Sequence, residues 1–222
     1  ALGAGAASPS GTAGALTTCD AGGAYRDRYL RAWGPGALGG LRVGLYQHSS
    51  VARDLLGEIL AGLGAEVILL ARSETFIPVD TEAVDPETRA LLRDWCAEHR
   101  LDALVSTDGD ADRPMLVCET GALIPGDGLG AMTARALGAD TVVTPVNSNT
   151  QADAMGFDRV IRTRIGSPFV IAGMEEAGGR VVGYEANGGT LLGFDAEGPA
   201  GPLPRLATRD AVLPILAPLA AA

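Results

Sequence analysis

The chain has 222 residues, of which 47% are hydrophobic and 20% charged, a balance typical of a globular protein that holds one large domain or two small ones. Its formal net charge of -10 at pH 7 disfavours nucleic acid and anionic membranes as partners, because both present phosphate groups that an acidic protein repels. No segment is apolar over a length that could span a bilayer, so we expect no membrane partner.

The basic residues and the cysteines exclude further classes of chemistry. All 17 basic residues are arginines, which excludes mechanisms that depend on a lysine Schiff base or a lysine general base. Cys19, Cys96 and Cys118 are odd in number and far apart, so we expect neither a disulfide framework nor a zinc site, and a cytoplasmic location is the simplest interpretation. Because the chain begins with Ala1 and not Met, we expect it to be part of something longer.

The first 38 residues are rich in small side chains. They predict a flexible start, a short helix around Tyr25–Trp33 and a linker at Gly34–Gly36. This segment, 1–38, could be the remnant of a first domain.

From Leu41 onward, predicted strands alternate with predicted helices, which is typical of a parallel sheet with right-handed crossovers. We expect the first helix to bury Val51, Leu55, Ile59 and Leu63, and the second to bury Leu91, Leu92 and Trp95. The expected elements are a strand at Leu41–Tyr46, a helix at Val51–Leu63, a strand at Glu66–Leu70, a helix at Pro86–His99 and a strand at Leu101–Val105.

A predicted hairpin, Pro114–Cys118 and Ala122–Ile124, interrupts the alternation, which then restarts. We therefore predict an α/β fold of two consecutive three-layer α/β/α domains with mixed, mostly parallel sheets, at residues 39–122 and 123–222. The expected elements of the second domain are helices at Gly128–Leu137, Asn149–Met155, Ser167–Ala177 and Thr208–Ala222 and strands at Thr141–Thr144, Arg159–Thr163, Arg180–Tyr184 and Thr190–Phe194.

An acidic loop follows the third predicted strand, at the edge of the sheet where open α/β folds bind ligands. Asp108, Asp110 and Asp112 alternate over five residues and Arg113 follows. Three such carboxylates repel one another unless a cation lies among them, and oxygen-only ligands suit Mg2+. The spacing also matches the start of an EF-hand, although Arg113 stands where that loop needs glycine, and a solvated turn without a ligand is a further alternative.

Two other motifs follow predicted strands. In the segment 183–189, Glu185, Asn187 and Gly188 could bind vicinal hydroxyl groups, although Asn187-Gly188 is also a strong hairpin turn. In the segment 162–168, Arg164, Gly166 and Ser167 could bind an anion at a helix start, although a plain helix cap by Ser167 is the default interpretation. Before the first helix of the alternation, we expect Ser49 or Ser50 to act as a cap, with His48 as a further contact.

Together these three motifs resemble the α-D-phosphohexomutase family, which comprises phosphomannomutases and phosphoglucomutases. The segment 108–113 is similar to that family's magnesium loop, 185–189 to its sugar-recognition loop, and 163–166 to its substrate-contacting loop, where many members have lysine in place of Arg164. The resemblance spans most of residues 39–222 and implies the second and third of the family's four domains.

The resemblance also implies a hexose phosphate substrate, a Mg2+ cofactor and roles for individual residues. Asp108, Asp110 and Asp112 would bind Mg2+, and Arg113 would contact the phosphoryl oxygens. Glu185 would bind sugar hydroxyls, and Arg164 would contact the substrate or assist proton transfer.

This sequence departs from the family pattern in two respects. It contains no Ser-His-Asn loop of the kind that carries the family's phosphoserine, for which Ser8-Pro9-Ser10-Gly11 is no convincing substitute. We also expect the family's fourth domain to be missing after Ala222. We therefore expect a fragment that binds Mg2+ weakly, turns over little or no substrate alone, and has the missing first and fourth domains as partners. The alternative is a non-enzymatic module that binds a sugar phosphate or is completed by a partner polypeptide.

Overall fold

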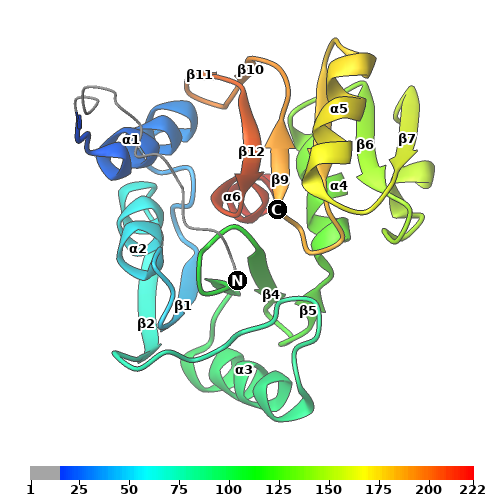
Figure 1. Cartoon of the computed structure of the whole chain (residues 1–222). Helices are drawn as coiled ribbons and strands as arrows, with labels where there is room; N and C mark the ends of the chain where they lie inside the picture. The colour runs from blue at the N-terminus through cyan, green and yellow to red at the C-terminus, as the bar shows by residue number, and fades with distance from the viewer. Residues whose placement is uncertain (1–15) are drawn as a thin grey trace, which may run out of the picture.

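The computed structural model describes residues 16–222 and contains two five-stranded sheets with helices on both faces (Figure 1). The expected flexible start up to residue 15, including Ser8 and Ser10, lies outside the described residues. Two α/β/α domains with mixed sheets are therefore present, as predicted. None of the helices within residues 16–222 has the length and apolar content that a membrane crossing requires.

The first sheet has the strand order β2-β1-β3-β4-β5. Strand β1 pairs in parallel with β2 and β3, and the pairings of β4 with β3 and β5 are antiparallel. The strands are β1 (Arg42–His48), β2 (Glu66–Arg72), β3 (Ala103–Thr107), β4 (Pro114–Cys118) and β5 (Leu123–Ile124), and the helices are α2 (Arg53–Gly62) and α3 (Pro86–His99).

The second sheet has the strand order β12-β9-β8-β6-β7 and repeats this mixture of two parallel and two antiparallel pairings. A separate two-stranded ribbon is formed by β10 (Ala196–Glu197) and β11 (Pro202–Leu203). The strands are β6 (Thr141–Pro145), β7 (Arg159–Thr163), β8 (Val181–Tyr184), β9 (Thr190–Leu192) and β12 (Leu206–Asp210), and the helices are α4 (Gly126–Ala136), the short η1 (Gln151–Ala154), α5 (Ser167–Ala177) and α6 (Val212–Ala221).

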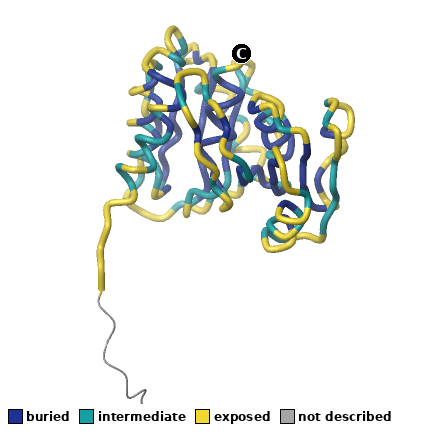
Figure 2. Tube along the Cα trace, turned by 90° about the horizontal axis from the view of Figure 1, so that it is seen from above, coloured by how far each residue is buried: buried dark blue, intermediate teal, exposed yellow. Residues whose placement is uncertain are grey.

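The two sheets share one central layer of helices. A single hydrophobic cluster contains Val43 and Leu45 from the first sheet, Val142 and Val182 from the second, and Leu216 from α6. Helix α6 packs against both α4 and β4, and Figure 1 shows it between the two sheets. The outer faces have separate clusters, under α3 for the first sheet and under α5 for the second. In Figure 2 the buried segments lie in the interior of the molecule, and the exposed segments follow its outline.

The helix α1 (Ala21–Trp33) belongs to the central layer as well. Asp20 caps its start by accepting a hydrogen bond from Gly23 N, and Tyr29, Ala32 and Trp33 are buried. The segment that follows is held by hydrogen bonds from Gly36 N and Leu38 N to Leu63 O. Helix α1 and the segment after it up to Leu38 are thus packed against the rest of the chain, while residues 16–20 are exposed.

The buried faces of two helices differ in part from the predicted ones. In α2 the buried residues are Leu56, Ile59 and Leu60, whereas Val51 is 76% exposed because the helix begins only at Arg53. In α3 the buried residues are Leu92 and Cys96, and Leu91 faces solvent. Of the predicted core positions, Ile59, Leu63 and Leu92 are buried, and Leu55 and Trp95 are partly buried against the core. Only Val51 and Leu91 are wrong, because Val51 precedes the helix and Leu91 lies on the exposed side of α3.

The last predicted helix, Thr208–Ala222, is wrong at its start. Thr208 and Arg209 belong to β12, which pairs antiparallel with β9, and the helix begins at Val212. Asp210 ends the strand, and its carboxylate accepts hydrogen bonds from Val212 N and Leu213 N in the first turn of α6, whose N-cap is Ala211.

Candidate functional site

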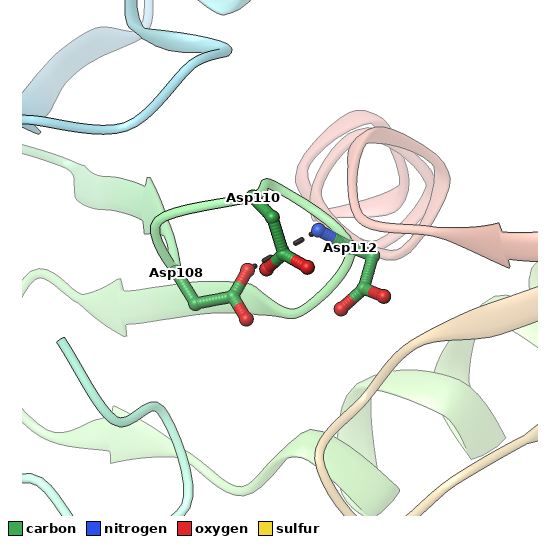
Figure 3. Close-up of side chains that lie close together, drawn as sticks. All are labelled: Asp108, Asp110 and Asp112. Carbon is green, nitrogen blue, oxygen red and sulfur yellow. Dashed lines mark hydrogen bonds between the residues drawn. The ribbon is translucent and has the colours of Figure 1, made fainter. Parts of the chain in front are cut away.

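The acidic loop connects the antiparallel strands β3 and β4 and is closed by the first of its carboxylates (Figure 3). Asp108 Oδ1 accepts hydrogen bonds from Asp112 N and Arg113 N, each 3.2 Å long, and Asp108 N donates to Arg113 O. Ala111 has a φ of 66°, which turns the chain between Asp110 and Asp112. The sequence folds into a tight loop here because its own aspartate satisfies the backbone amides of the turn.

The loop brings three carboxylates together, as Figure 3 shows. Oxygens of Asp108, Asp110 and Asp112 lie within 4.8 Å of one another, with Asp108 buried and Asp110 exposed. Burial, followed by the neighbouring charges of Asp110 and Asp112, raises the pKa of the Asp108 carboxyl. Asp112 Oδ1 is buried and accepts no hydrogen bond from the residues that the structure describes. An all-oxygen donor set with an unsatisfied buried oxygen fits a hard divalent cation such as Mg2+.

Arg113 partly offsets the charge of these carboxylates. Its Nε atom lies 3.6 Å from Asp108 Oδ2 and 3.8 Å from Asp112 Oδ1. Both distances are longer than a charge-assisted hydrogen bond, and Nε itself has no hydrogen-bond partner within the described part of the chain. Its side chain is therefore paired loosely enough to turn toward an incoming anion.

The residues at 48–51 support the acidic loop and do not cap a helix as predicted. His48 Nε2 donates to Thr107 O over 2.8 Å, and Val51 N donates to Gly109 O over 3.1 Å. Ser50 Oγ lies 2.7 Å from Thr107 Oγ1, while Ser49 Oγ accepts a hydrogen bond from Ile77 N. The N-cap of α2 is Ala52, without a side-chain cap, so the predicted cap by Ser49 or Ser50 is wrong.

The predicted sugar loop is the hairpin turn between β8 and β9. Gly188 N donates to Glu185 O, Glu185 N donates to Gly189 O, and Asn187 Oδ1 accepts from Gly189 N. The side chains of Glu185 and Asn187 are nevertheless buried and line a cavity. The segment is therefore a hairpin turn, and the same turn holds the side chains of Glu185 and Asn187 at the cavity.

The hairpin turn and the acidic loop lie in direct contact, and glycines permit it. A Cβ atom on Gly188 would lie 2.7 Å from Pro114 Cγ, and one on Gly189 would lie 3.0 Å from Asp112 O. Gly188 also has a φ of 90°, which other residues rarely adopt. The absence of side chains on Gly188 and Gly189 therefore lets the hairpin turn approach Pro114 and Asp112 closely.

Two cavities flank this contact. The smaller, of about 240 Å³, is lined by Arg113, Glu185, Asn187, Arg209 and Ile165 among others. The larger, of about 610 Å³, contains Asp108 and Asp110 and has Arg113 in its wall as well. Arg113 thus connects the acidic cavity with the one that contains the predicted sugar-binding residues.

The third predicted motif contributes less than expected. Ile165 lines the smaller cavity, whereas the exposed Arg164 guanidinium lies over the Phe169 ring, 4.7 Å from its centroid. Gly166, with a φ of 120°, is the N-cap of α5 and Ser167 is the first residue of the helix, so the predicted cap by Ser167 is wrong. The structure therefore brings this loop to the rim of the cavity without bringing Arg164, Gly166 or Ser167 into its lining.

Arg209 is a residue of the site that the sequence did not indicate. Its Nη2 atom contacts Asp112 Oδ2, and its Nη1 atom lies 3.5 Å from Glu185 Oε2. The apolar pattern predicts a helix at this position, although Asp210, a good N-cap residue before an apolar run, is a signal that the helix starts later.

The fold and the cavities define an α/β protein in which an acidic loop from one sheet meets a hairpin loop from a second sheet. Family models of phosphoglucomutase/phosphomannomutase match the chain, alpha/beta/alpha domain II over residues 29–121 and domain III over residues 125–222. The chain therefore belongs to the phosphoglucomutase/phosphomannomutase family.

Individual relatives agree with this assignment. A phosphomannomutase of Sinorhizobium fredii is 49% identical over 199 residues, which are 88% of this chain and 42% of that protein. A phosphomannomutase of Salmonella muenchen is 43% identical over 79% of this chain and 37% of that protein. The chain thus spans less than half the length of these relatives.

The fold is also that of solved structures. A putative phosphomannomutase from Thermus thermophilus superposes with a TM-score of 0.67 at 21% identity, over 93% of this chain and 48% of that one. A phosphoglucomutase/phosphomannomutase family protein from Burkholderia thailandensis gives a TM-score of 0.70 at 17% identity, over 90% of this chain and 43% of that one.

Proposed function

We propose that this chain supplies the metal-binding and sugar-binding parts of a site for intramolecular phosphoryl transfer on hexose phosphates, in a cytoplasmic enzyme of the phosphomannomutase type. The observation that supports this best is the direct contact between the acidic loop and the hairpin loop beside a cavity lined by Arg113, Glu185 and Asn187. Each of these groups suits one part of a hexose phosphate, because a guanidinium binds phosphate and a carboxylate accepts hydrogen bonds from hydroxyls.

The acidic loop is the proposed Mg2+ site, with Asp108, Asp110 and Asp112 as ligands. When bound, the ion would neutralise charge on a phosphoryl group, which is the main task of a metal in such transfers. Arg113 would bind phosphoryl oxygens, since its Nε atom has no hydrogen-bond partner within residues 16–222.

The remaining predicted residues would hold the sugar. Glu185 would accept hydrogen bonds from its hydroxyls and Asn187 would add a donor or acceptor, while Gly188 keeps the loop close to the acidic loop. Arg164, Gly166 and Ser167 are proposed as contacts at the rim, which requires Arg164 to leave the Phe169 ring.

The phosphoryl donor is proposed to come from a segment outside these 222 residues. The sequence offers no serine loop that matches the family's, and covalent transfer cannot proceed without the nucleophile. We therefore propose that the 222-residue chain has little or no mutase activity alone, and that the first and fourth family domains complete it.

The alternative is a non-enzymatic module that binds a sugar phosphate or is completed by a partner polypeptide. The observation in its favour is apolar surface beside the acidic loop. Phe76 and Val51 are 71% and 76% exposed and line the larger cavity. Surface of this kind suits a protein partner, whether the missing domains or another chain.

The binding test uses the purified chain with Mg2+ and mannose 1-phosphate in calorimetric titrations. We expect Asp110→Asn and Asp112→Asn to lower the Mg2+ affinity about 10-fold or more, since each removes a charged ligand. Asp94→Asn, on the exposed face of α3, is the matched control and should leave the affinity unchanged. A wild-type chain that binds neither ligand would contradict the proposed site.

The activity test compares the chain with a chimera in which the flanking parts of the Sinorhizobium relative are joined to it. With mannose 1-phosphate and a bisphosphate activator, the chimera should turn over and Asp110→Asn in the chimera should not. Robust mutase activity of the chain alone would refute the need for an external nucleophile. A folded chimera that binds both ligands without turnover would favour the non-enzymatic module.

A further inference from the structure

Arg209 lies where the two loops of the site meet, and its two terminal nitrogens contact different loops. Nη2 contacts Asp112 Oδ2 of the acidic loop, while Nη1 lies 3.5 Å from Glu185 Oε2 of the hairpin loop. A guanidinium has rigid, forked donors, so one arginine can hold two carboxylates at a fixed separation, which a lysine ammonium cannot do in the same way.

The contact of Arg209 with Asp112 leaves the other oxygen of that carboxylate without a hydrogen bond from the described residues, with Arg113 Nε 3.8 Å away. Oδ2 faces Arg209, whereas the buried Oδ1 accepts no hydrogen bond from the residues between 16 and 222. When Arg209 holds Oδ2 of Asp112, it also fixes the direction in which Oδ1 points. Hydrogen-bonded partners orient metal ligands in this way.

The backbone that carries Arg209 is itself held in place. The next residue, Asp210, is buried and accepts hydrogen bonds from Tyr25 Oη at 2.6 Å, from Tyr29 Oη and from two amides of α6. Strand β12 also pairs with β9, where Thr190 lies opposite Asp210. Arg209 Cδ fits against the hairpin loop because Gly189 has no side chain, since a Cβ atom there would lie 3.2 Å away.

We propose that Arg209 is a positioning residue that bridges Asp112 and Glu185 and so keeps the acidic loop and the hairpin loop in register. The role of Arg209 in the reaction rests on the proposed function, in which Asp112 binds the metal and Glu185 binds the sugar. Arg209 would align these two residues. The bridge itself exists without either ligand, and this allows it to be tested separately.

The first experiment uses the ligand-free chain and measures amide hydrogen exchange by NMR. The reporters are the amides of Asp112 and Arg113, bonded to Asp108 Oδ1, and those of Gly188 and Gly189, bonded within the hairpin turn. If Arg209 bridges the loops, Arg209→Gln raises the exchange rates of both pairs several-fold, because each loop loses the group that ties it to the other.

The control is Arg205→Gln, an exposed arginine that precedes the same strand, which should change neither pair. Faster exchange in only one loop, or in neither, would overturn the bridge. The thermal midpoint of each variant shows whether the change is local.

The second experiment measures Mg2+ affinity and separates positioning from charge. A bridging role predicts a loss of about 10-fold in both Arg209→Lys and Arg209→Gln, because neither can hold the two carboxylates at once. If Arg209 only contributed positive charge, Arg209→Lys would bind Mg2+ like the wild type and Arg209→Gln would bind it more tightly, and either result would refute the inference. A wild-type chain that does not bind Mg2+ would refute the proposed metal site, while the exchange data would still decide on the bridge.

Discussion

Gly188 shows how one residue without a side chain determines the geometry of this site. Its φ of 90° already disfavours other residues, and a Cβ atom would lie 2.7 Å from Cγ of Pro114, the first residue of β4 after the acidic loop. We expect Gly188→Ala to lower the free energy of unfolding by about 1–3 kcal/mol, from backbone strain and the forced separation of the two loops.

A matched control for this substitution is Gly40→Ala. Gly40 has a φ of 88°, but no atom lies within 4 Å of the place that an alanine Cβ would take, so only the backbone strain applies and a loss of about 1 kcal/mol is expected. Urea unfolding of both variants gives the comparison. Equal losses would mean that the contact between the loops is loose enough to absorb a methyl group.

Residues of the site differ in how readily the sequence indicates them. Asp108, Asp110 and Asp112 are close in sequence, and their alternation after an apolar strand predicts a cluster, which the structure contains. Arg209 has no such local signal, because its partners Asp112 and Glu185 belong to other segments and only the tertiary fold brings them together. Arg164 is the opposite case, because its motif indicates a site residue but its guanidinium lies over Phe169 and outside the cavity lining.

At the level of secondary-structure elements, the alternation of strands and helices in the sequence predicted the two α/β units well. It predicted the ends of individual elements less accurately. The start of α6 was misplaced because the apolar run after Asp210 was extended back to Thr208, while pairing of β12 with β9 places Thr208 and Arg209 in a strand. The start of α2 was placed too early because Val51 lies before the helix, where its amide donates a hydrogen bond to Gly109 O. In both cases non-local contacts decided the local structure.

The cluster of Tyr25, Tyr29 and Asp210 ties α1 to the junction of β12 and α6, and it predicts a loss of stability at alkaline pH. Burial, followed by the charge of Asp210, raises the pKa of Tyr25 and of Tyr29 well above the ordinary value of about 10. The neutral phenols contribute stability that is fully present below about pH 10. This contribution is lost as the pH rises toward the folded-state pKa values, because the unfolded chain releases these protons first.

We therefore expect the urea midpoint to be flat from about pH 8 to 9 and to fall above about pH 10, together with the appearance of tyrosinate absorbance. Tyr25→Phe should be less stable at about pH 8 by about 1–3 kcal/mol, because it removes a hydrogen bond to a buried carboxylate, and should show a shallower decline above about pH 10. An unchanged alkaline slope in the Tyr25→Phe, Tyr29→Phe double variant would contradict the assignment. A tyrosinate signal that appears before unfolding in the wild type and is missing from the double variant would do the same.

For the molecule as a whole, the central layer makes two sheets depend on each other. The family models divide the chain between residues 121 and 125, yet one hydrophobic cluster contains core residues of both sheets and of the helices α1, α2, α4 and α6. The acidic loop and the hairpin loop, which leave different sheets, are held in contact by this shared layer. A site built from loops of two sheets requires the sheets to keep a fixed relative position. The shared hydrophobic core fixes this position.

This arrangement predicts that the chain unfolds as one cooperative unit. Leu216 of α6 is fully buried in the central layer, so Leu216→Ala should cost about 2–5 kcal/mol. If the core is shared, the protection of amides in β1 and β3 should fall by the same factor as that of amides in β6 and β8, although Leu216 belongs to the second half of the chain. Leu91→Ala, at a position that is 43% exposed on α3, is the matched control and should cost less than about 1 kcal/mol. Hydrogen exchange with mass spectrometry of the four strands distinguishes the outcomes, and a loss confined to β6 and β8 would show that the two sheets unfold independently.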